Sequence, residues 1–297
     1  MKKVSFVVLH YGELNITDVC VQSIFKMDDQ EQIHIVIVDN EIHASMEHRE
    51  KIKKRYENHK NVTVIPIMEN GGFSYANNVG YQYAKNMGTD FVIICNNDIE
   101  FLQNDFVDIL YREQEIHRCH VMSPDIVHRR TSEHQSPMDQ RIRTSQEARY
   151  TIQMNKVALK LYPIIYPLFY LWNKKQEKSR LDNKQKNKKY YQSVQTEIVP
   201  FGACLIFTSL FLEMEDKAFE PETKFYYEEY MLALRCHKQK YLSIYDPKLK
   251  VVHETGEATK KSLKSQYKRT KFIMQNTLDS CKIYLDFLLK DDGVKNT

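Results

Sequence analysis

Glycine and proline are scarce in this sequence, with eight of each among 297 residues. Collagen-like and low-complexity chains need far more of both, so these classes are excluded. The 42% of hydrophobic residues likewise excludes a chain that is disordered throughout. A residue used this rarely marks places where the backbone accepts little else. The glycines are Gly12, Gly71, Gly72, Gly80, Gly88, Gly202, Gly256 and Gly293.

The sequence also lacks paired cysteine motifs and long apolar runs. Its six cysteines show no CxxC spacing, and Cys95 and Cys204 lie within apolar segments, as small buried residues do in a reducing compartment. The apolar run at the N-terminus ends by Leu9 without a small-residue cleavage site, so no signal peptide is expected. No apolar stretch reaches the roughly 18 residues of a membrane-spanning helix. We therefore expect a cytoplasmic protein.

Positive charge is concentrated in one segment. The whole chain carries +4, whereas residues 173–191 alone hold eight basic and two acidic residues. Residues 157–172 before it are apolar and aromatic, and such a segment beside a basic run is typical of a bilayer interface. One interpretation is an anionic membrane surface as partner, at the inner face of the plasma membrane; the other is a solvated loop after a helix that packs on the core. Because no nucleic-acid-binding motif surrounds the basic run, no nucleic acid is expected as a partner.

The first 125 residues alternate between strand-like and helix-like patterns. Short apolar runs of strand length lie at 4–9, 33–38, 62–67 and 91–95. Segments with helical spacing lie between them, at 15–26, 44–57 and 74–86. This alternation predicts an α/β fold with a mostly parallel central sheet flanked by helices, in which ligands bind beyond the carboxyl ends of the strands.

The second half of the chain is less regular. Residues 129–195 lose the alternation and are interpreted as an insertion of aromatic and basic character. Order returns at 198–208, followed by a helix that opens near Tyr226, two strands around 241–252 and a last helix at about 262–290.

Polar residues follow each predicted strand, where the sheet would bind a ligand. Neither a GxxxxGK[ST] phosphate loop nor a GxGxxG motif after the first strand is present. Asp39 either forms a turn or accepts hydrogen bonds from a nucleobase or a ribose hydroxyl, and its position favours neither. Asp98, in the sequence NND, either forms a turn or offers a hard oxygen ligand to Mg²⁺ or Mn²⁺.

The most specific segment is NGGFSYANNVG at residues 70–80, which holds three of the eight glycines. Gly71 and Gly72 permit a positive φ or a close backbone approach to a ligand. Ser74 is a candidate cap for the helix that follows, whose N-terminus would direct free N–H groups towards an anion. A tight turn alone would not need the third glycine.

Seven motifs occur in order along the chain. They are VVLHYGE (7–13), VDN (38–40), NGGFSYANNVG (70–80), NND (96–98), FGACLIF (201–207), FYYEEYMLALR (225–235) and VVHETGEAT (251–259). Together they resemble family 2 inverting glycosyltransferases of the GT-A fold, in the rhamnosyltransferase-like branch, over about 1–125 and 196–260. The resemblance implies a catalytic domain at 1–260, followed by a C-terminal helical extension at 261–297. Within that domain it implies a nucleotide-binding half at 1–125, the insertion at about 129–195 and an acceptor half at 196–260.

The resemblance also implies an activity. The protein would move a sugar from a nucleoside diphosphate donor to a saccharide acceptor carried on a lipid, with inversion, in bacterial surface polysaccharide biosynthesis. A divalent metal, Mg²⁺ or Mn²⁺, would be held by Asp98 and His253. Glu229, or its neighbour Glu228, would be the base that takes the proton of the attacking hydroxyl. The donor-binding residues so implied are His10, Tyr11, Asp39, Asn70, Gly71, Asn77, Asn97 and Gly202.

Other interpretations of the same residues stay open. Paired glutamates at a helix start also complement the helix dipole, and His253 also fits a buried structural histidine. The family's Glu-Asp is Glu-Glu here, Met231 replaces a second acid, and Asn96 leaves Asp98 as the only acid of the DxD-type motif. The alternatives are a non-catalytic, glycosyltransferase-like membrane scaffold and a sugar nucleotidyltransferase. The latter normally has a glycine- and arginine-rich loop where this chain has HYGEL.

Overall fold

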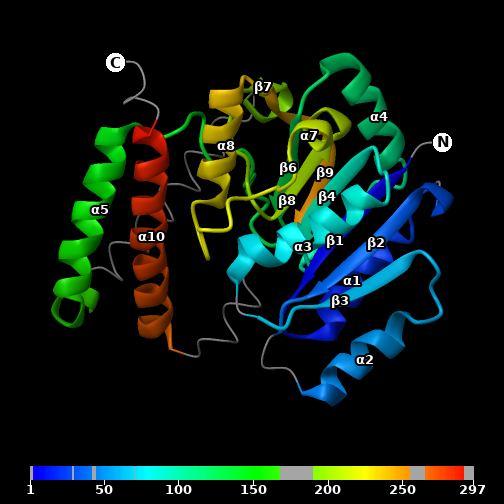
Figure 1. The fold of residues 1–297 in the computed structure, drawn as a ribbon, viewed down its shortest axis with the longest axis horizontal. Coiled ribbons are helices and arrows are strands. Elements are labelled where there is room, and N and C mark those ends of the chain that lie inside the picture. The colour runs from blue at the N-terminus through cyan, green and yellow to red at the C-terminus, as the bar shows by residue number, and fades with distance from the viewer. Residues whose placement is uncertain are drawn as a thin grey trace.

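The first half of the chain builds the parallel part of one large sheet (Figure 1). Its strands pair in the order β3-β2-β1-β4, and they are β1 (Val4–His10), β2 (Ile33–Asp39), β3 (Val62–Pro66) and β4 (Phe91–Asn96). They form where the sequence predicts strands, and all residues of β1 are buried, as expected for a sheet covered on both faces. The computed structural model describes residues 3–28, 30–41, 45–69, 71–167, 190–254 and 265–290.

The sheet continues beyond β4 with strands of both directions. β8 (Cys204–Thr208) lies between β4 and β6 (Val121–His128) and is antiparallel to both. Next come β9 (Ser243–His253), parallel to β6, and β5 (Ile99–Phe101), antiparallel to β9. The short β7 (Gln195–Thr196) also pairs with β9. The predicted α/β fold, with a mostly parallel sheet flanked by helices, is thereby confirmed.

One strand, β9, lies where the sequence predicts two. Its register against β6 jumps from the pair Pro124–Asp246 to the pair Asp125–Lys250. The residues left unpaired between these two positions include Pro247 and form a bulge. Because proline has no N–H to donate, a sheet tolerates it at a bulge. The proline interrupts the sequence pattern without ending the strand, so the prediction of two strands was wrong.

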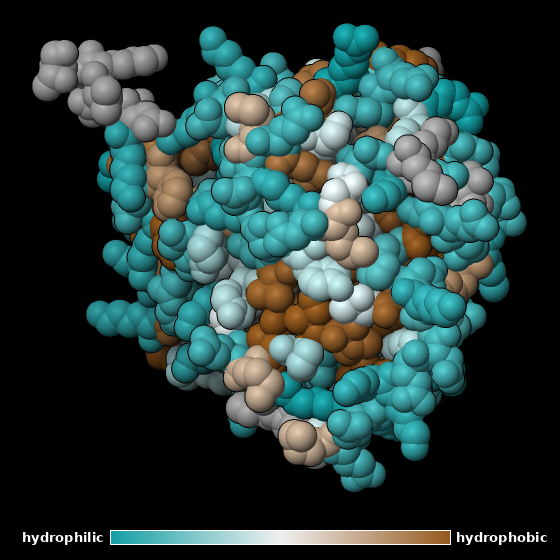
Figure 2. All heavy atoms as spheres, turned by 45° about the vertical axis from the view of Figure 1, so that its right-hand side comes forward, coloured by the Kyte–Doolittle hydropathy of each residue, from teal (hydrophilic) through white to brown (hydrophobic). Residues whose placement is uncertain are grey.

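Helices cover both faces of the sheet. On one face, around Phe6 and Ile35, pack α1 (Leu14–Ile24), α2 (Met46–Tyr56) and α4 (Phe106–His117). On the other face, around Val36 and Phe207, pack α3 (Gly72–Asn86), α7 (Ser209–Met214) and α8 (Glu228–Gln239). The short 3₁₀ helices are η1 (Gln30–Gln32) and η2 (Tyr190–Gln192). The face shown in Figure 2 is mostly hydrophilic, with hydrophobic side chains gathered near its centre. The six cysteines are buried free thiols, as predicted.

Two further helices pack against each other beside the sheet. α5 (Ser145–Lys160) lies within the predicted insertion, and α10 (Gln266–Leu289) is the predicted C-terminal helix. They lie side by side and next to α8 in Figure 1. Thr144 and Glu147 form the capping box that begins α5. Ala148 of α5 and Tyr284 of α10 are buried in one cluster with side chains of α8, so the insertion and the C-terminal helix share a core.

Of the segment predicted to contact a membrane, the structure describes the first part, residues 157–167. Residues 168–189, with most of the basic run, lie outside the described residues. Tyr162 is buried, and its hydroxyl donates to the carbonyl oxygen of Tyr267 in α10 over 2.9 Å, whereas Ile164 is exposed. Among the helices of the described part, none combines the length and the apolar character that crossing a membrane requires.

Candidate active site

Three parallel strands end beside one another and place polar side chains at one edge of the sheet. In the strand register, His10 of β1 lies opposite Asp39 of β2, and Leu9 lies opposite Asn96 of β4. The turn after β4 carries Asp98. These predicted site residues lie near one another because parallel strands end at the same edge of the sheet, which is where such sheets bind ligands.

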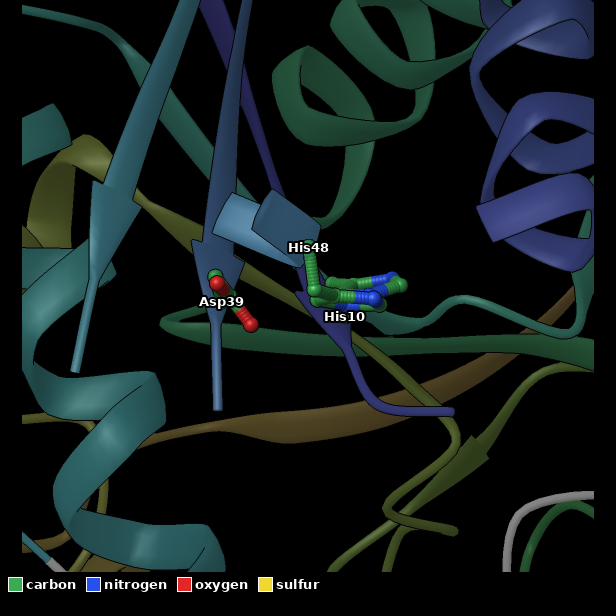
Figure 3. Close-up of side chains that lie close together, drawn as sticks. All are labelled: His10, Asp39 and His48. Carbon is green, nitrogen blue, oxygen red and sulfur yellow. The ribbon is translucent and has the colours of Figure 1, made fainter. Parts of the chain in front are cut away.

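His10 and Asp39 lie close to a residue that the sequence did not single out, His48 of α2 (Figure 3). His10 is fully buried, with its Nδ1 2.6 Å from Thr17 Oγ1 and its Nε2 3.4 Å from His48 Nε2. Burial lowers the pKa of His10 to about 4 against the opposing charge of Asp39. His10 is therefore neutral at neutral pH and can donate or accept a hydrogen bond. Ligand atoms of His10, Asp39 and His48 lie within 4.8 Å of one another, so this group also suits a metal ion.

Asn97 ties the turn after β4 to the end of β1. Its Nδ2 donates to Thr17 Oγ1 over 2.9 Å and to the carbonyl oxygen of Tyr11 over 3.2 Å. Because both amide hydrogens are used inside the protein, Asn97 positions Tyr11 and, through Thr17, His10. Direct contact of Asn97 and Tyr11 with a donor stays a prediction.

Asp98 and His253, the two residues implied as metal ligands, lie in contact. His253 ends β9, where it pairs with Ile99 directly after Asp98, and His253 Nε2 is 3.2 Å from Asp98 Oδ1. Gln135 Oε1 lies 2.7 Å from His253 Nδ1, which donates to it. In the protonated ring, Nε2 therefore directs a proton towards the carboxylate. In the neutral ring, Nε2 directs a lone pair towards it, and a cation bound between the two groups would accept that lone pair. One carboxylate and one imidazole, both nearly buried, thus fit a divalent cation.

The two glutamates of the predicted base begin α8. Tyr226 and Tyr227 before them have positive φ values of 65° and 71°, which non-glycine residues rarely adopt. Such backbone strain concentrates at functional sites. Glu228 is buried and Glu229 is half-buried, and Glu229 Oε1 accepts a hydrogen bond from the N–H of Gly202 over 3.1 Å. The strained turn therefore brings the second glutamate to a specific backbone donor.

The two carboxyl groups differ in how strongly burial raises their pKa. Burial raises the pKa of both, and at Glu228, where the shift is larger, the charge of Glu229 raises it further. At Glu229 the Gly202 N–H opposes the shift because it favours the charged form. Glu228 is therefore the carboxyl whose neutral form burial favours more strongly, and Glu229 is the one whose pKa moves towards the working range of a general base.

The turn at residues 201–203 connects these groups. A Cβ on Gly202 would lie 2.5 Å from Glu229 Oε1, so any side chain at this position would have to displace that carboxylate. The ring of Phe201 packs edge-on against His253 with 6.0 Å between ring centroids. The carbonyl oxygen of Ala203 accepts a hydrogen bond from the N–H of Asn96 over 2.9 Å. This turn therefore links Glu229 to the Asp98–His253 pair and to the end of β4.

Replacing Gly202 by alanine should displace the Glu229 carboxylate. Its backbone has no positive φ, so the added methyl group acts mainly through the clash with Oε1. A displacement of about 1 Å can lower a rate by roughly 10²-fold. We expect a loss of that order in kcat with the melting temperature little changed, and unchanged kcat would show that the contact has no part in turnover.

The segment 70–80 places fewer groups in the site than predicted. Asn70 lies outside the described residues, and Gly71 precedes α3, which begins at Gly72 without a side-chain cap. The prediction that Ser74 caps α3 was wrong, because Ser74 lies inside the first turn. Its hydroxyl is instead 3.2 Å from that of Thr223, in the loop that leads to α8.

Two glycines of this segment serve packing within the protein. Gly72 has a φ of 79°, and a Cβ there would lie 2.5 Å from the carbonyl oxygen of Lys224. A Cβ on Gly80 would lie 2.3 Å from a methyl carbon of Val7, so the third glycine lets α3 approach β1 closely. Asn77 donates to the carbonyl oxygen of Phe73, and its buried Oδ1 has no hydrogen-bond partner among the described residues. The donor-binding role of Asn77 stays a prediction, and its Oδ1 is the atom that could accept a hydrogen bond from a donor.

Comparison with known protein families shows which family the chain belongs to. The model of a family described as glycosyl transferase family 2 matches residues 5–199. The chain belongs to this family. The matched range ends just before the 201–203 turn, so Glu229 and His253 of this family 2 glycosyltransferase lie outside it. No curated protein matches the sequence.

Solved glycosyltransferase structures share the fold over nearly the whole chain. Residues 1–349 of S. aureus TarS are 13% identical, with a TM-score of 0.54 over 97% of this chain and 70% of that one. The mannosyltransferase PcManGT from Pyrobaculum calidifontis, in complex with GDP-Man and Mn²⁺, is 12% identical, with a TM-score of 0.52 over 99% and 76%. The match to TarS with UDP-GlcNAc covers 43% of this chain and 35% of that one at a TM-score of 0.37. At these identities the likeness shows the GT-A fold alone, and the rhamnosyltransferase-like branch stays a prediction.

Proposed function

We propose that this family 2 glycosyltransferase moves a sugar from a nucleoside diphosphate donor to a saccharide hydroxyl with inversion. The observation that carries the proposal is the 201–203 turn, which holds Glu229 and contacts His253 of the Asp98–His253 pair. A single displacement needs a base for the attacking hydroxyl and positive charge for the leaving diphosphate. The structural neighbour solved with GDP-Man and Mn²⁺ supports this donor class and a divalent metal.

In the proposed reaction Glu229 takes the proton of the acceptor hydroxyl as its oxygen attacks the anomeric carbon. The Gly202 N–H orients the carboxylate, and burial makes it a stronger base than an exposed glutamate. The new carbon–oxygen bond forms while the bond to the diphosphate oxygen breaks, and the diphosphate leaves with the electron pair. Attack from the opposite face inverts the anomeric carbon. A divalent cation, Mg²⁺ or Mn²⁺, held by Asp98 and His253 would neutralise charge on the leaving group.

The strand ends would bind the nucleoside part of the donor. Asp39 is buried, and its Oδ1 already accepts from the N–H of Glu41 over 3.1 Å, which holds the carboxylate at the edge of the sheet. It offers acceptors to N–H and hydroxyl groups of a nucleoside. The neutral imidazole of His10 offers a donor or an acceptor beside it. Gly71 and Asn77 at the start of α3 would complete the pocket.

A panel of nucleoside diphosphate sugars tests this function. Each donor is assayed with Mn²⁺ and saccharide acceptors for release of nucleoside diphosphate. We expect metal-dependent release from one class of donor. Nucleotide binding without release from any donor would indicate the non-catalytic scaffold, and pyrophosphate release from a nucleoside triphosphate and a sugar phosphate would indicate a nucleotidyltransferase.

We further propose that the acceptor is lipid-linked, in surface polysaccharide assembly, and that residues 157–189 hold the enzyme at the cytoplasmic leaflet. The exposed Ile164 and the basic run support this placement. Basic residues near anionic lipid contribute about 1 kcal/mol each, so replacing the four lysines of 184–189 by glutamine should weaken binding by about 10²-fold or more. Co-sedimentation with anionic liposomes measures this, with neutral liposomes as control. Unchanged binding would leave the solvated-loop interpretation.

A further inference from the structure

A second cluster of metal-binding side chains lies where the end of α4 meets the bulge of β9. Glu113 and His117 lie one helical turn apart on α4, and Asp246 lies just before the bulge. Each offers a ligand atom, and these atoms lie within 4.8 Å of one another. Asp246 precedes His253 by seven residues of extended chain, roughly 20 Å. The cluster is therefore separate from the candidate active site.

The spacing within the cluster suits a small dication. His117 Nε2 is 3.4 Å from Glu113 Oε2. Ligands bound about 2.1 Å from a tetrahedral zinc ion are themselves about 3.4 Å apart. Glu113 and Asp246 are almost fully buried, whereas His117 reaches the surface. A cation could therefore enter beside His117 and contact the two buried carboxylates.

One carboxylate oxygen of Asp246 is buried without a hydrogen-bond partner among the described residues. Its Oδ1 accepts a hydrogen bond from the backbone N–H of Lys248 over 2.9 Å, but its buried Oδ2 has no hydrogen-bond partner among the described residues. A buried polar atom without a partner is costly, and a charged oxygen more so. An unpaired, fully buried carboxylate oxygen beside two other ligands indicates that the site accommodates a cation.

Lys248 supplies part of the positive charge that the two carboxylates require. Its ammonium group lies 2.8 and 2.9 Å from the two carboxylate oxygens of Glu113, but its side chain is 59% exposed. One ammonium cannot neutralise two carboxylates, and its contact with Glu113 leaves Asp246 Oδ2 unpaired. Because the lysine is long and exposed, it can move into solvent when a metal ion enters. A groove of about 760 Å³, lined by Glu113, Pro247 and Lys248, lies beside the cluster.

We propose that Glu113, His117 and Asp246 bind a divalent transition-metal ion of the Zn²⁺ class, which fastens the end of α4 to the bulge of β9. One imidazole nitrogen with two carboxylate oxygens is a ligand set that zinc accepts, whereas magnesium and calcium favour oxygen alone. Two carboxylates and a dication make a neutral site. The ion stabilises the fold, and the proposal does not depend on the donor reaction.

Zinc binding to the chelator-treated full chain tests this site. At about 100 times its dissociation constant, Zn²⁺ should raise the melting temperature of the wild type by about 5 °C. His117→Ala should lose this rise and one equivalent of zinc by calorimetry. His237→Ala is the matched control, because it removes an exposed histidine of α8 that belongs to neither metal-binding cluster, and it should keep both.

A variant with the opposite expected effect guards against simple misfolding. Lys248→Met removes the competing ammonium group and should tighten zinc binding several-fold. Asp246→Asn should abolish the zinc-induced rise in melting temperature. Equal zinc stoichiometry and equal thermal shifts in the wild type, His117→Ala and Lys248→Met would overturn the proposal, as would a wild type that binds no zinc.

Discussion

Replacing Glu229 by glutamine should lower kcat by about 10²–10⁴-fold, the usual contribution of a positioned general base. The amide keeps the size of the side chain but cannot take the proton of the acceptor hydroxyl. Because burial raises the pKa of Glu229, kcat of the wild type should fall as the pH decreases through a value above the usual glutamate range. The rate of nucleoside diphosphate release, measured against pH for both proteins, checks this prediction.

Glu228→Gln is the matched control, since it makes the same change one residue earlier. Burial raises the pKa of Glu228 well above its usual value, so glutamine imitates the neutral form that burial favours for this carboxyl. We expect near-wild-type kcat. Ionisation of a buried glutamic acid destabilises the folded state as the pH rises, so this variant should also lose less stability at alkaline pH than the wild type. If Glu228→Gln lost activity and Glu229→Gln kept it, the base would be assigned to the wrong carboxyl.

Asp98→Asn should have the second large effect, on the metal requirement. The substitution keeps the shape of the side chain but removes the charge that faces His253. Partners outside the first coordination shell already contribute about 10–100-fold to metal affinity or activity, so the loss of a direct ligand should reach at least about 100-fold. The Mn²⁺ concentration that gives half-maximal release of nucleoside diphosphate measures it.

Asp286→Asn, an exposed change on α10, is the control for the metal experiment and should keep the wild-type Mn²⁺ dependence. His253→Gln should behave like Asp98→Asn, because it removes the other proposed ligand of the pair. An Asp98→Asn variant with the Mn²⁺ dependence of the wild type would remove Asp98 from the metal site.

The parallel half of the fold could be predicted from the sequence because its signal is local. Continuous apolar runs mark β1 and β4, and strand ends in a parallel sheet locate Asp39 and Asp98 without further information. The bulge in β9 could not be predicted, because Pro247 breaks the pattern in the same way as a turn does. Ser74 is a good cap by composition, but the helix begins two residues earlier, at Gly72.

The contacts of the site are long-range and so left little trace in the sequence. The pairing of Asp98 with His253 depends on β5 lying beside β9, and the resemblance to a family named both residues without their geometry. Gln135 fixes the ring of His253 from within the predicted insertion, where no motif marks it. His48 faces His10 from a charged helix, and a helical histidine carries no strand-end signal. The requirement for Gly202 follows from Glu229, which approaches it from another element of the fold.

The anomeric configuration of the product tests the central claim most directly. The donor that gives the highest release in the panel is incubated with its acceptor, and proton NMR of the early product reports the new linkage. Single displacement assisted by Glu229 predicts the configuration opposite to that of the donor. A product that retains the donor configuration would contradict the account.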